Sequence, residues 1–335
     1  MRLEILATIL FTLCAAGLAE IPKLPPLSDA EIIAITEHKS GKLSNPVITR
    51  EPAPSVHVKV ESVSGEGPVE ATIDSSAARV QRLKTAGKDT YIWPGIILVG
   101  HRGTVKFAPE NTIVAFNTAI EHGADLLEMD IRETKDGHLI VMHDASIART
   151  TTGRGDVALM NLEEIRAFDA GSKFDAKFIG EKVPTFQEVL KAIEGRALPD
   201  IDFKAGDPQK LVEAVRAAGL VGKGTLYCGD WAKLKETLAI EPGFVIRPTA
   251  PKGLPGLNSV IAEFDPPIVN IDWGNFSEEL VRRIHIEGKL AFVNTMGKND
   301  NEASYKRAIS AGADYIQSDN LELLLPILKA RGLHM

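Results

Sequence analysis

The feature that most constrains the fold is a rhythm that begins near residue 96 and continues almost to the end of the chain. Short runs of aliphatic and β-branched residues alternate there with helical stretches, of which 111–123 and 277–288 both end in glycine, a common C-terminal stop. Eight such runs in roughly 245 residues predict an α/β fold, a (β/α)8 TIM barrel over residues 91–335. The expected strands are IILVG (96–100), LLEMDI (126–131), PDIDF (199–203), GTLYC (224–228), GFVIR (243–247), IVNID (268–272), LAFVN (290–294) and DYIQS (314–318).

Residues 138–184 interrupt this repeat. HLIVMH (138–143) is typical of one extra strand, and residues 145–184 do not fit the simple alternation. We interpret both as an insertion after the second barrel strand. A doubly wound open sheet is the alternative, but no Gly-x-Gly-x-x-Gly follows the first strand.

Residues 1–19 have the layout of a secretory signal peptide. Arg2 precedes an apolar run, and the small residues of Gly17-Leu18-Ala19 fit a cleavage site. This layout predicts an exported protein, periplasmic or secreted, with no stable membrane insertion after the peptide is removed. An uncleaved anchor and an ordinary N-terminal helix are the alternatives.

Residues 20–90 differ from the barrel region in being rich in proline, as linkers and arms are. Val56, Val58 and Val60 alternate with polar residues, and the turn-forming SGEG leads into VEATI (69–73), which predicts a hairpin. We therefore expect an N-terminal extension that packs either on the barrel or on a second subunit.

The charge and the cysteines narrow the class of partner. A net charge of −7 and a pI near 5.7 argue against a nucleic-acid surface and favour a small-molecule substrate, so any phosphate site must be a local positive spot. Once a signal peptide is removed, Cys228 is the only cysteine left. It lies in an apolar run, so we expect a buried structural thiol and no intramolecular disulfide.

Carboxylates occur where this pattern predicts strand interiors and strand ends. Glu128 and Asp130 alternate with apolar residues and therefore project to one face, and Asp202 lies in the third barrel strand. Like charges in a half-buried place repel, which requires a compensating positive charge. A Mg²⁺ or Ca²⁺ ion would supply it, and so would lysine or arginine partners without any metal.

Histidines and basic residues follow other strand ends, where the chemistry of such a barrel lies. His101 and His143 are suited to proton transfer, although a single strand-end histidine is more often structural. Arg102 and Lys204 suit phosphate oxygens, but they could merely pair with Glu110 or with the carboxylates.

An ordered series of motifs resembles the glycerophosphodiester phosphodiesterase family. The series covers residues 96 to about 330, and a chance match of this length is implausible. Its segments are GHRGTVKFAPENTIVAF (100–116), GADLLEMDIRETKDGHLIVMHDASIARTTTGRG (123–155), VPTFQEVL (183–190), IDFK (201–204) and GADYIQSD (312–319).

The resemblance implies a TIM barrel with an insertion after strand two, and metal-dependent hydrolysis of glycerophosphodiesters to an alcohol and glycerol 3-phosphate. It also implies a role for individual residues. The family's carboxylate ligands of one divalent cation fall on Glu128, Asp130 and Asp202, its acid–base histidines on His101 and His143, its phosphate-binding residues on Arg102 and Lys204, and a supporting glutamate on Glu110.

The chain departs from the family at two positions. Asp202 stands where the family usually has glutamate, so this ligand is one methylene shorter, and Asn294 stands where an aromatic residue often shapes the leaving-group pocket. Two alternatives to glycerophosphodiester hydrolysis remain open. One is lysophospholipase D or sphingomyelinase D-like chemistry on the same barrel, and the other is a non-catalytic cell-envelope binding protein.

Overall fold

The computed structural model describes residues 95–334 and, before them, five short strands. These are β1 (Val47–Thr49), β2 (Ser55–Val60), β3 (Val69–Asp74), β4 (Gln81–Thr85) and β5 (Lys88–Ile92). Strand β2 pairs antiparallel with both β1 and β3, with Val60 opposite Val69, so the expected hairpin is confirmed. Strands β4 and β5 form a second antiparallel pair. The expected signal peptide, residues 1–19, lies outside the described residues.

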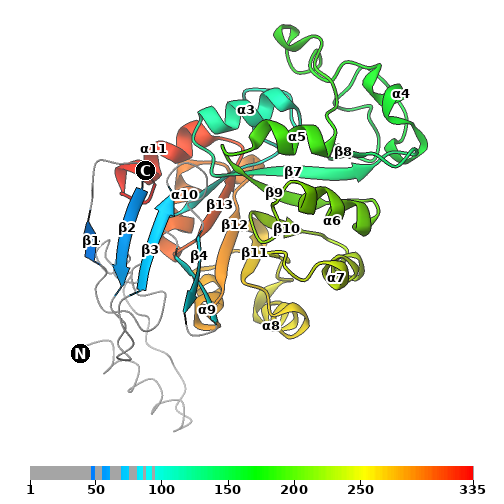
Figure 1. Cartoon of the computed structure of the whole chain (residues 1–335). Helices are drawn as coiled ribbons and strands as arrows, with labels where there is room; N and C mark the ends of the chain where they lie inside the picture. The colour runs from blue at the N-terminus through cyan, green and yellow to red at the C-terminus, as the bar shows by residue number, and fades with distance from the viewer. Residues whose placement is uncertain are drawn as a thin grey trace.

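A parallel sheet forms the barrel, in the order β10-β9-β7-β6-β13-β12-β11 (Figure 1). Its bounds agree with the expected strands to within two residues, because each is a short apolar run delimited by turn residues. They are β6 (Ile97–Gly100), β7 (Leu126–Glu133), β9 (Leu198–Phe203), β10 (Thr225–Tyr227), β11 (Ile268–Asp272), β12 (Leu290–Asn294) and β13 (Tyr315–Ser318).

The expected strand at 243–247 is wrong as a strand. Ile246 forms an isolated bridge with Leu226, and Thr249, just beyond the expected bounds, forms one with Asn270, so no continuous ladder results. Pro248 has no N–H to donate to a ladder, although its carbonyl accepts from the Asn270 N–H at 3.0 Å. The segment nevertheless lies between β10 and β11 and so joins the two ends of the sheet.

Helices cover the outer face of this sheet (Figure 1). An inner apolar cluster, which includes Val99, Leu126, Phe292 and Tyr315, fills the barrel below its C-terminal edge. Among the described residues, no helix combines the length and apolarity needed to span a bilayer. The helices are α3 (Ile113–Glu121), α5 (Phe186–Ile193), α6 (Pro208–Ala217), α7 (Trp231–Ile240), α8 (Gly253–Phe264), α9 (Glu278–Ile286), α10 (Glu302–Ala311) and α11 (Leu321–Ala330).

The expected insertion is confirmed, and it has a small core of its own. Strand β8 (Leu139–Val141) pairs antiparallel with the far end of β7, and α4 (Leu162–Arg166) lies beyond it (Figure 1). Two short 3₁₀ turns, η1 (Val157–Leu159) and η2 (Ala176–Phe178), complete it. Its core consists of Ile140, Met142, Ile147, Val157, Ile165, Ala170 and Val183.

Candidate functional site

Two neighbouring strands place the carboxylates on one face. In β7, Leu126 belongs to the inner cluster, Glu128 and Asp130 follow on the same face, and the intervening apolar residues pack in the outer layer, as expected. The parallel register sets Asp130 beside Asp202 of β9. One ligand oxygen from each of Glu128, Asp130 and Asp202 lies within 4.8 Å of the others, and all three residues are buried. The shorter side chain of Asp202 therefore still reaches the group.

Two basic side chains neutralise part of this charge. Lys204 Nζ lies 2.5 Å from an oxygen of Asp202 and 3.2 Å from one of Asp130, and Arg102 Nε lies 3.5 Å from the other Asp130 oxygen. Burial raises the pKa of Asp130, but Lys204 and Arg102 outweigh it and lower that pKa overall. The alternative of lysine and arginine partners is thus partly realised.

Among the described residues, no lysine or arginine forms an ion pair with Glu128, although His101 Nε2 lies 4.0 Å from its Oε2. The same Oε2 accepts a hydrogen bond from the Arg102 backbone N–H at 2.8 Å. Burial, followed by the charges of Asp130 and Asp202, raises the pKa of Glu128 well above its usual range. Burial also raises the pKa of Asp202 against the opposing effect of Lys204. When all three carboxylates are deprotonated, they carry more negative charge than Lys204 and Arg102 compensate, which adds to burial in raising these pKa values.

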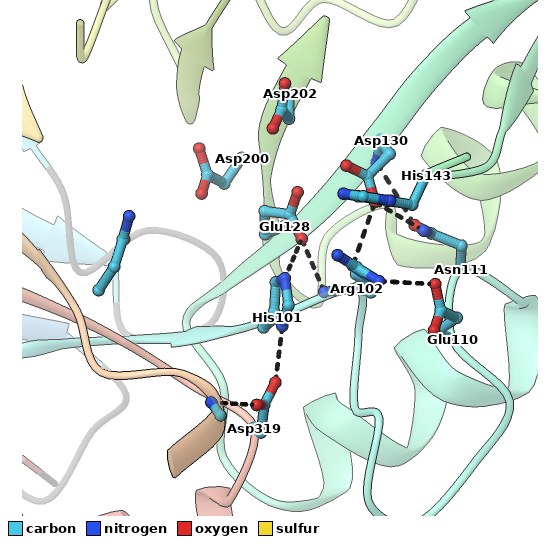
Figure 2. Close-up of polar contacts among 12 residues, drawn as sticks. His101, Arg102, Glu110, Asn111, Glu128, Asp130, His143, Asp200, Asp202 and Asp319 are labelled. Atoms are coloured by element: carbon cyan, nitrogen blue, oxygen red, sulfur yellow. Dashed lines mark hydrogen bonds and ion pairs between the residues drawn. The ribbon is translucent and has the colours of Figure 1, made fainter. Parts of the chain in front are cut away.

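The backbone is held in an unusual conformation where Arg102 and Asn111 contact the carboxylates. Both residues have left-handed φ angles, 52° and 58°, which are rare for residues other than glycine and often mark functional sites. Asn111 Nδ2 donates to Asp130 at 2.8 Å, and Arg102 Nη1 donates to Glu110 at 2.9 Å (Figure 2). Sequence reasoning missed Asn111, although it follows Glu110 in the quoted PENT motif.

His101 lies between two carboxylates. Its Nδ1 is 2.6 Å from Asp319 Oδ1, and its Nε2 is 4.0 Å from Glu128 Oε2 (Figure 2). Asp319 directly follows β13. Asp319 is the last residue of the quoted segment GADYIQSD (312–319), but sequence reasoning predicted no role for it.

His143 follows β8, at the boundary of the insertion. Its Nδ1 lies 2.8 Å from Asp144, which also accepts from Arg149 Nε at 2.6 Å. Arg149 extends further to Glu110 with two hydrogen bonds of 2.7 and 2.8 Å, so Glu110 links Arg102 and Arg149. Sequence reasoning missed Asp144 and Arg149, although both stand in the quoted HDASIART segment.

Asn294 ends β12 and contacts the neighbouring strand rather than the carboxylate group. Its Nδ2 donates to Asp272 of β11 at 2.8 Å. Because a carboxylate only accepts, this contact fixes the orientation of the amide, and Asn294 Oδ1 is left buried without a hydrogen bond.

The carboxylate group fits a hard divalent cation. Its donors are all oxygens, and Asp202 Oδ1 and Asp130 Oδ1 are buried without a hydrogen bond, apart from the ion-pair contact of Asp130 with Lys204. Surplus negative charge and orphaned oxygens are both relieved when a cation binds.

Known proteins share this architecture and these motifs. The glycerophosphoryl diester phosphodiesterase family model matches residues 101–223. A glycerophosphodiester phosphodiesterase of Caldanaerobacter subterraneus is 33% identical over 243 residues, which cover 70% of this chain and 99% of that protein. The crystal structure of a glycerophosphodiester phosphodiesterase from Agrobacterium tumefaciens is 32% identical, covers 69% of this chain and 99% of its own, and gives a TM-score of 0.62.

A further solved structure supports the fold. A phosphodiesterase from Oleispira antarctica, in complex with the product sn-glycerol-3-phosphate, is 20% identical and covers 70% of this chain and 97% of its own, with a TM-score of 0.66.

Proposed function

Because this chain belongs to the glycerophosphoryl diester phosphodiesterase family and is a phosphoric diester hydrolase, we propose that it hydrolyses glycerophosphodiesters to an alcohol and sn-glycerol 3-phosphate. The observation that carries the proposal is the convergence at one site of three buried carboxylates, a histidine and two basic side chains. Such substrates arise when phospholipids lose their acyl chains, so glycerophospholipid degradation is the context that we propose for the reaction.

Glu128, Asp130 and Asp202 would hold one divalent cation, Mg²⁺ or Ca²⁺. When bound, such a cation polarises the phosphoryl group and lowers the pKa of a nucleophilic hydroxyl or water.

The other residues bind the phosphate and transfer protons. The guanidinium of Arg102 and the ammonium of Lys204 point to the carboxylate group, where they can stabilise the charge on phosphate oxygens. Nδ1 of both His101 and His143 faces an aspartate, so Nε2 is the nitrogen left to exchange a proton with the substrate. One histidine would activate the nucleophile and the other would protonate the leaving alkoxide.

A panel of phosphodiesters tests the proposal. Glycerophosphodiesters should be hydrolysed, EDTA should abolish the activity, and Mg²⁺ or Ca²⁺ should restore it. Undiminished turnover after EDTA would contradict the metal requirement. Lysophospholipids and sphingomyelin assayed in parallel test the two lipid alternatives, and preferred turnover of either would redirect the proposal to that lipid.

Export of the protein is a separate part of the proposal. The apolar run and small residues of 1–19 support a signal peptide, so the mature chain should begin near Glu20 in the periplasm or outside the cell. N-terminal sequencing of the exported protein would reject cleavage if it found Met1 intact.

A further inference from the structure

Asp319 is held at both of its oxygens. Oδ1 lies 2.6 Å from His101 Nδ1, and Oδ2 accepts from the Gly297 N–H at 2.8 Å (Figure 2). Gly297 belongs to the loop after β12 and has a left-handed φ of 66°. The carboxylate therefore cannot rotate away from His101 without losing a backbone hydrogen bond.

The strand register determines that these two residues meet. Strand β13 pairs parallel with β6, with Ser318 opposite Gly100, and the His101 N–H donates to the Ser318 carbonyl at 3.2 Å. His101 and Asp319 are thus the next residues beyond the paired ends of two adjacent strands. Both side chains are largely buried, with 14% and 19% of their surfaces exposed.

The histidine–aspartate pairs of His101 and His143 differ in what else the aspartate binds. Asp144, the partner of His143, also binds Arg149 through both of its oxygens. Asp319, in the part of the chain that the structure describes, forms an ion pair only with His101. The Asp144 charge is therefore largely compensated by arginine, whereas the Asp319 carboxylate acts on one imidazole.

We propose that Asp319 is a positioning residue: it holds His101 in the tautomer protonated at Nδ1 and directs Nε2 towards the carboxylate group at Glu128. A carboxylate can only accept, so a neutral imidazole beside it must carry its proton on the facing nitrogen. The lone pair is then on Nε2, the nitrogen that faces the site. The kinetic consequence rests on the function proposed above, but the tautomer itself does not.

The sharpest test is Asp319→Asn. An asparagine has one accepting oxygen, whereas both Gly297 N–H and His101 Nδ1–H need an acceptor. Keeping the Gly297 bond turns the amide NH₂ towards His101, which favours the wrong tautomer. We expect kcat to fall about 10²-fold or more while KM changes by less than about threefold.

The tautomer is measured directly by ¹H–¹⁵N spectra of histidine-labelled protein, with the His101 signals identified from their loss in His101→Gln. The parent should show Nδ1–H at His101, and Asp319→Asn should show Nε2–H or a mixture. Asp319→Glu, which keeps an acceptor, should recover part of both the tautomer and kcat. It also serves as the test variant if Asp319→Asn does not fold.

Glu322→Gln is the matched control, because Glu322 lies 3.8 Å from His122 outside the site and is half exposed. It should leave kcat and the His101 signals unchanged. An unchanged His101 tautomer in Asp319→Asn, or a loss that appears in KM alone, would overturn the inference. A parent that hydrolyses no phosphodiester would refute the proposed function, while the spectra would still decide whether Asp319 sets the tautomer.

Discussion

Asp200 and Asp202 are two residues apart on β9 and lie on the same face of one strand, yet their surroundings differ completely. Asp200 is fully buried, and Arg247 binds both of its oxygens at 2.5 and 2.8 Å. Thr225 adds a third hydrogen bond. Asp202 shares Lys204 with Asp130, and its Oδ1 makes no hydrogen bond with any residue that the structure describes.

Asp200 and Arg247, which we call the lower pair, are both buried among other side chains. Arg247 packs against the rings of Tyr227 and Phe292, 5.0 and 4.3 Å from their centroids, and its Nη1 donates to Asn270 at 3.2 Å. Burial lowers the pKa of Arg247, but the Asp200 carboxylate outweighs it and raises that pKa. Among the described residues each charge of this pair has a dedicated partner and none of its side-chain polar atoms is buried without a hydrogen bond, which is typical of a structural ion pair.

The carboxylate group of Glu128, Asp130 and Asp202, which we call the upper group, lacks such complete pairing. It has three carboxylates against a shared lysine and an arginine that is also bound to Glu110. Asp200 and Asp202 are the same residue type on the same face of β9, so neither residue type nor strand position identifies function. What separates them is surplus charge together with buried oxygens that lack partners, which marks a place built for a ligand.

The largest effect should come from the upper group. Asp130→Asn removes one anionic ligand while keeping an oxygen for Asn111 Nδ2, so we expect phosphodiesterase activity to fall at least about 10³-fold and the fold to persist. Activity assays and melting curves on the same preparation measure both. A variant that loses its melting transition would show that the upper group, too, is structural.

The next largest effect should follow from substitution of the lower pair, and it should be a loss of stability. Arg247→Met leaves Asp200 buried without its cation, so unfolding free energy should drop by about 3–5 kcal/mol. The double variant Asp200→Leu with Arg247→Met removes both charges and should recover much of that loss. Denaturant unfolding measures it, and equal losses in the single and double variants would contradict the assignment.

Sequence reasoning found the upper group but could not separate it from the lower pair. Alternation along β7 and β9 is local, so it shows that Glu128, Asp130 and Asp202 share a face, and it places Asp200 there equally well. The partner that distinguishes Asp200 is Arg247, which is 47 residues away. Arg247 lies in the segment that was expected to be an ordinary strand, GFVIR (243–247).

Partner residues beyond the strand ends were missed for a related reason. Asp319 directly follows the expected strand DYIQS (314–318), but its contact with His101 depends on the register between β13 and β6, which are more than two hundred residues apart in sequence. His143 and Asp144 are adjacent in sequence, and Arg149 is near them, but only the folded insertion shows that Arg149 joins them to Glu110.

Substitutions of Asp202 test the one carboxylate of the upper group at which this chain has aspartate where the family usually has glutamate. Asp202→Ala should weaken divalent-cation binding on the order of 10²-fold, whereas Asp202→Glu, which keeps a carboxylate, should retain most of the affinity. Calorimetric titration with Mg²⁺ or Ca²⁺ measures both, with Glu236→Gln on the exposed face of α7 as the control. If Asp202→Ala bound the divalent cation as tightly as the parent does, Asp202 would be a structural residue and not a metal ligand.

The smallest expected effect is a pH-dependent change in the stability of the metal-free protein, and it distinguishes Glu128 of the upper group from Asp200 of the lower pair. Burial, Asp130 and Asp202 raise the pKa of Glu128 above its unfolded value, so the folded state binds a proton more readily than the unfolded state. Above the unfolded pKa, the Glu128 contribution therefore lowers stability as pH rises towards the folded pKa. Glu128→Gln removes the charge and keeps an acceptor for the Arg102 N–H, so it should stabilise the metal-free protein at neutral pH by about 3 kcal/mol, the scale of two like charges about 5 Å apart at an effective dielectric constant of 20.

The difference in unfolding free energy between the parent and Glu128→Gln should vanish as pH falls, because Glu128 is then protonated in the parent and both side chains are neutral. Chelator-treated parent and Glu128→Gln, unfolded in denaturant across a pH series, provide this comparison, and subtracting one from the other isolates Glu128 from its carboxylate neighbours. A saturating divalent cation should reverse the order, since it stabilises only the protein that binds it well. A Glu128→Gln variant less stable than the chelated parent at neutral pH would mean that this carboxylate, like Asp200, contributes to stability by itself.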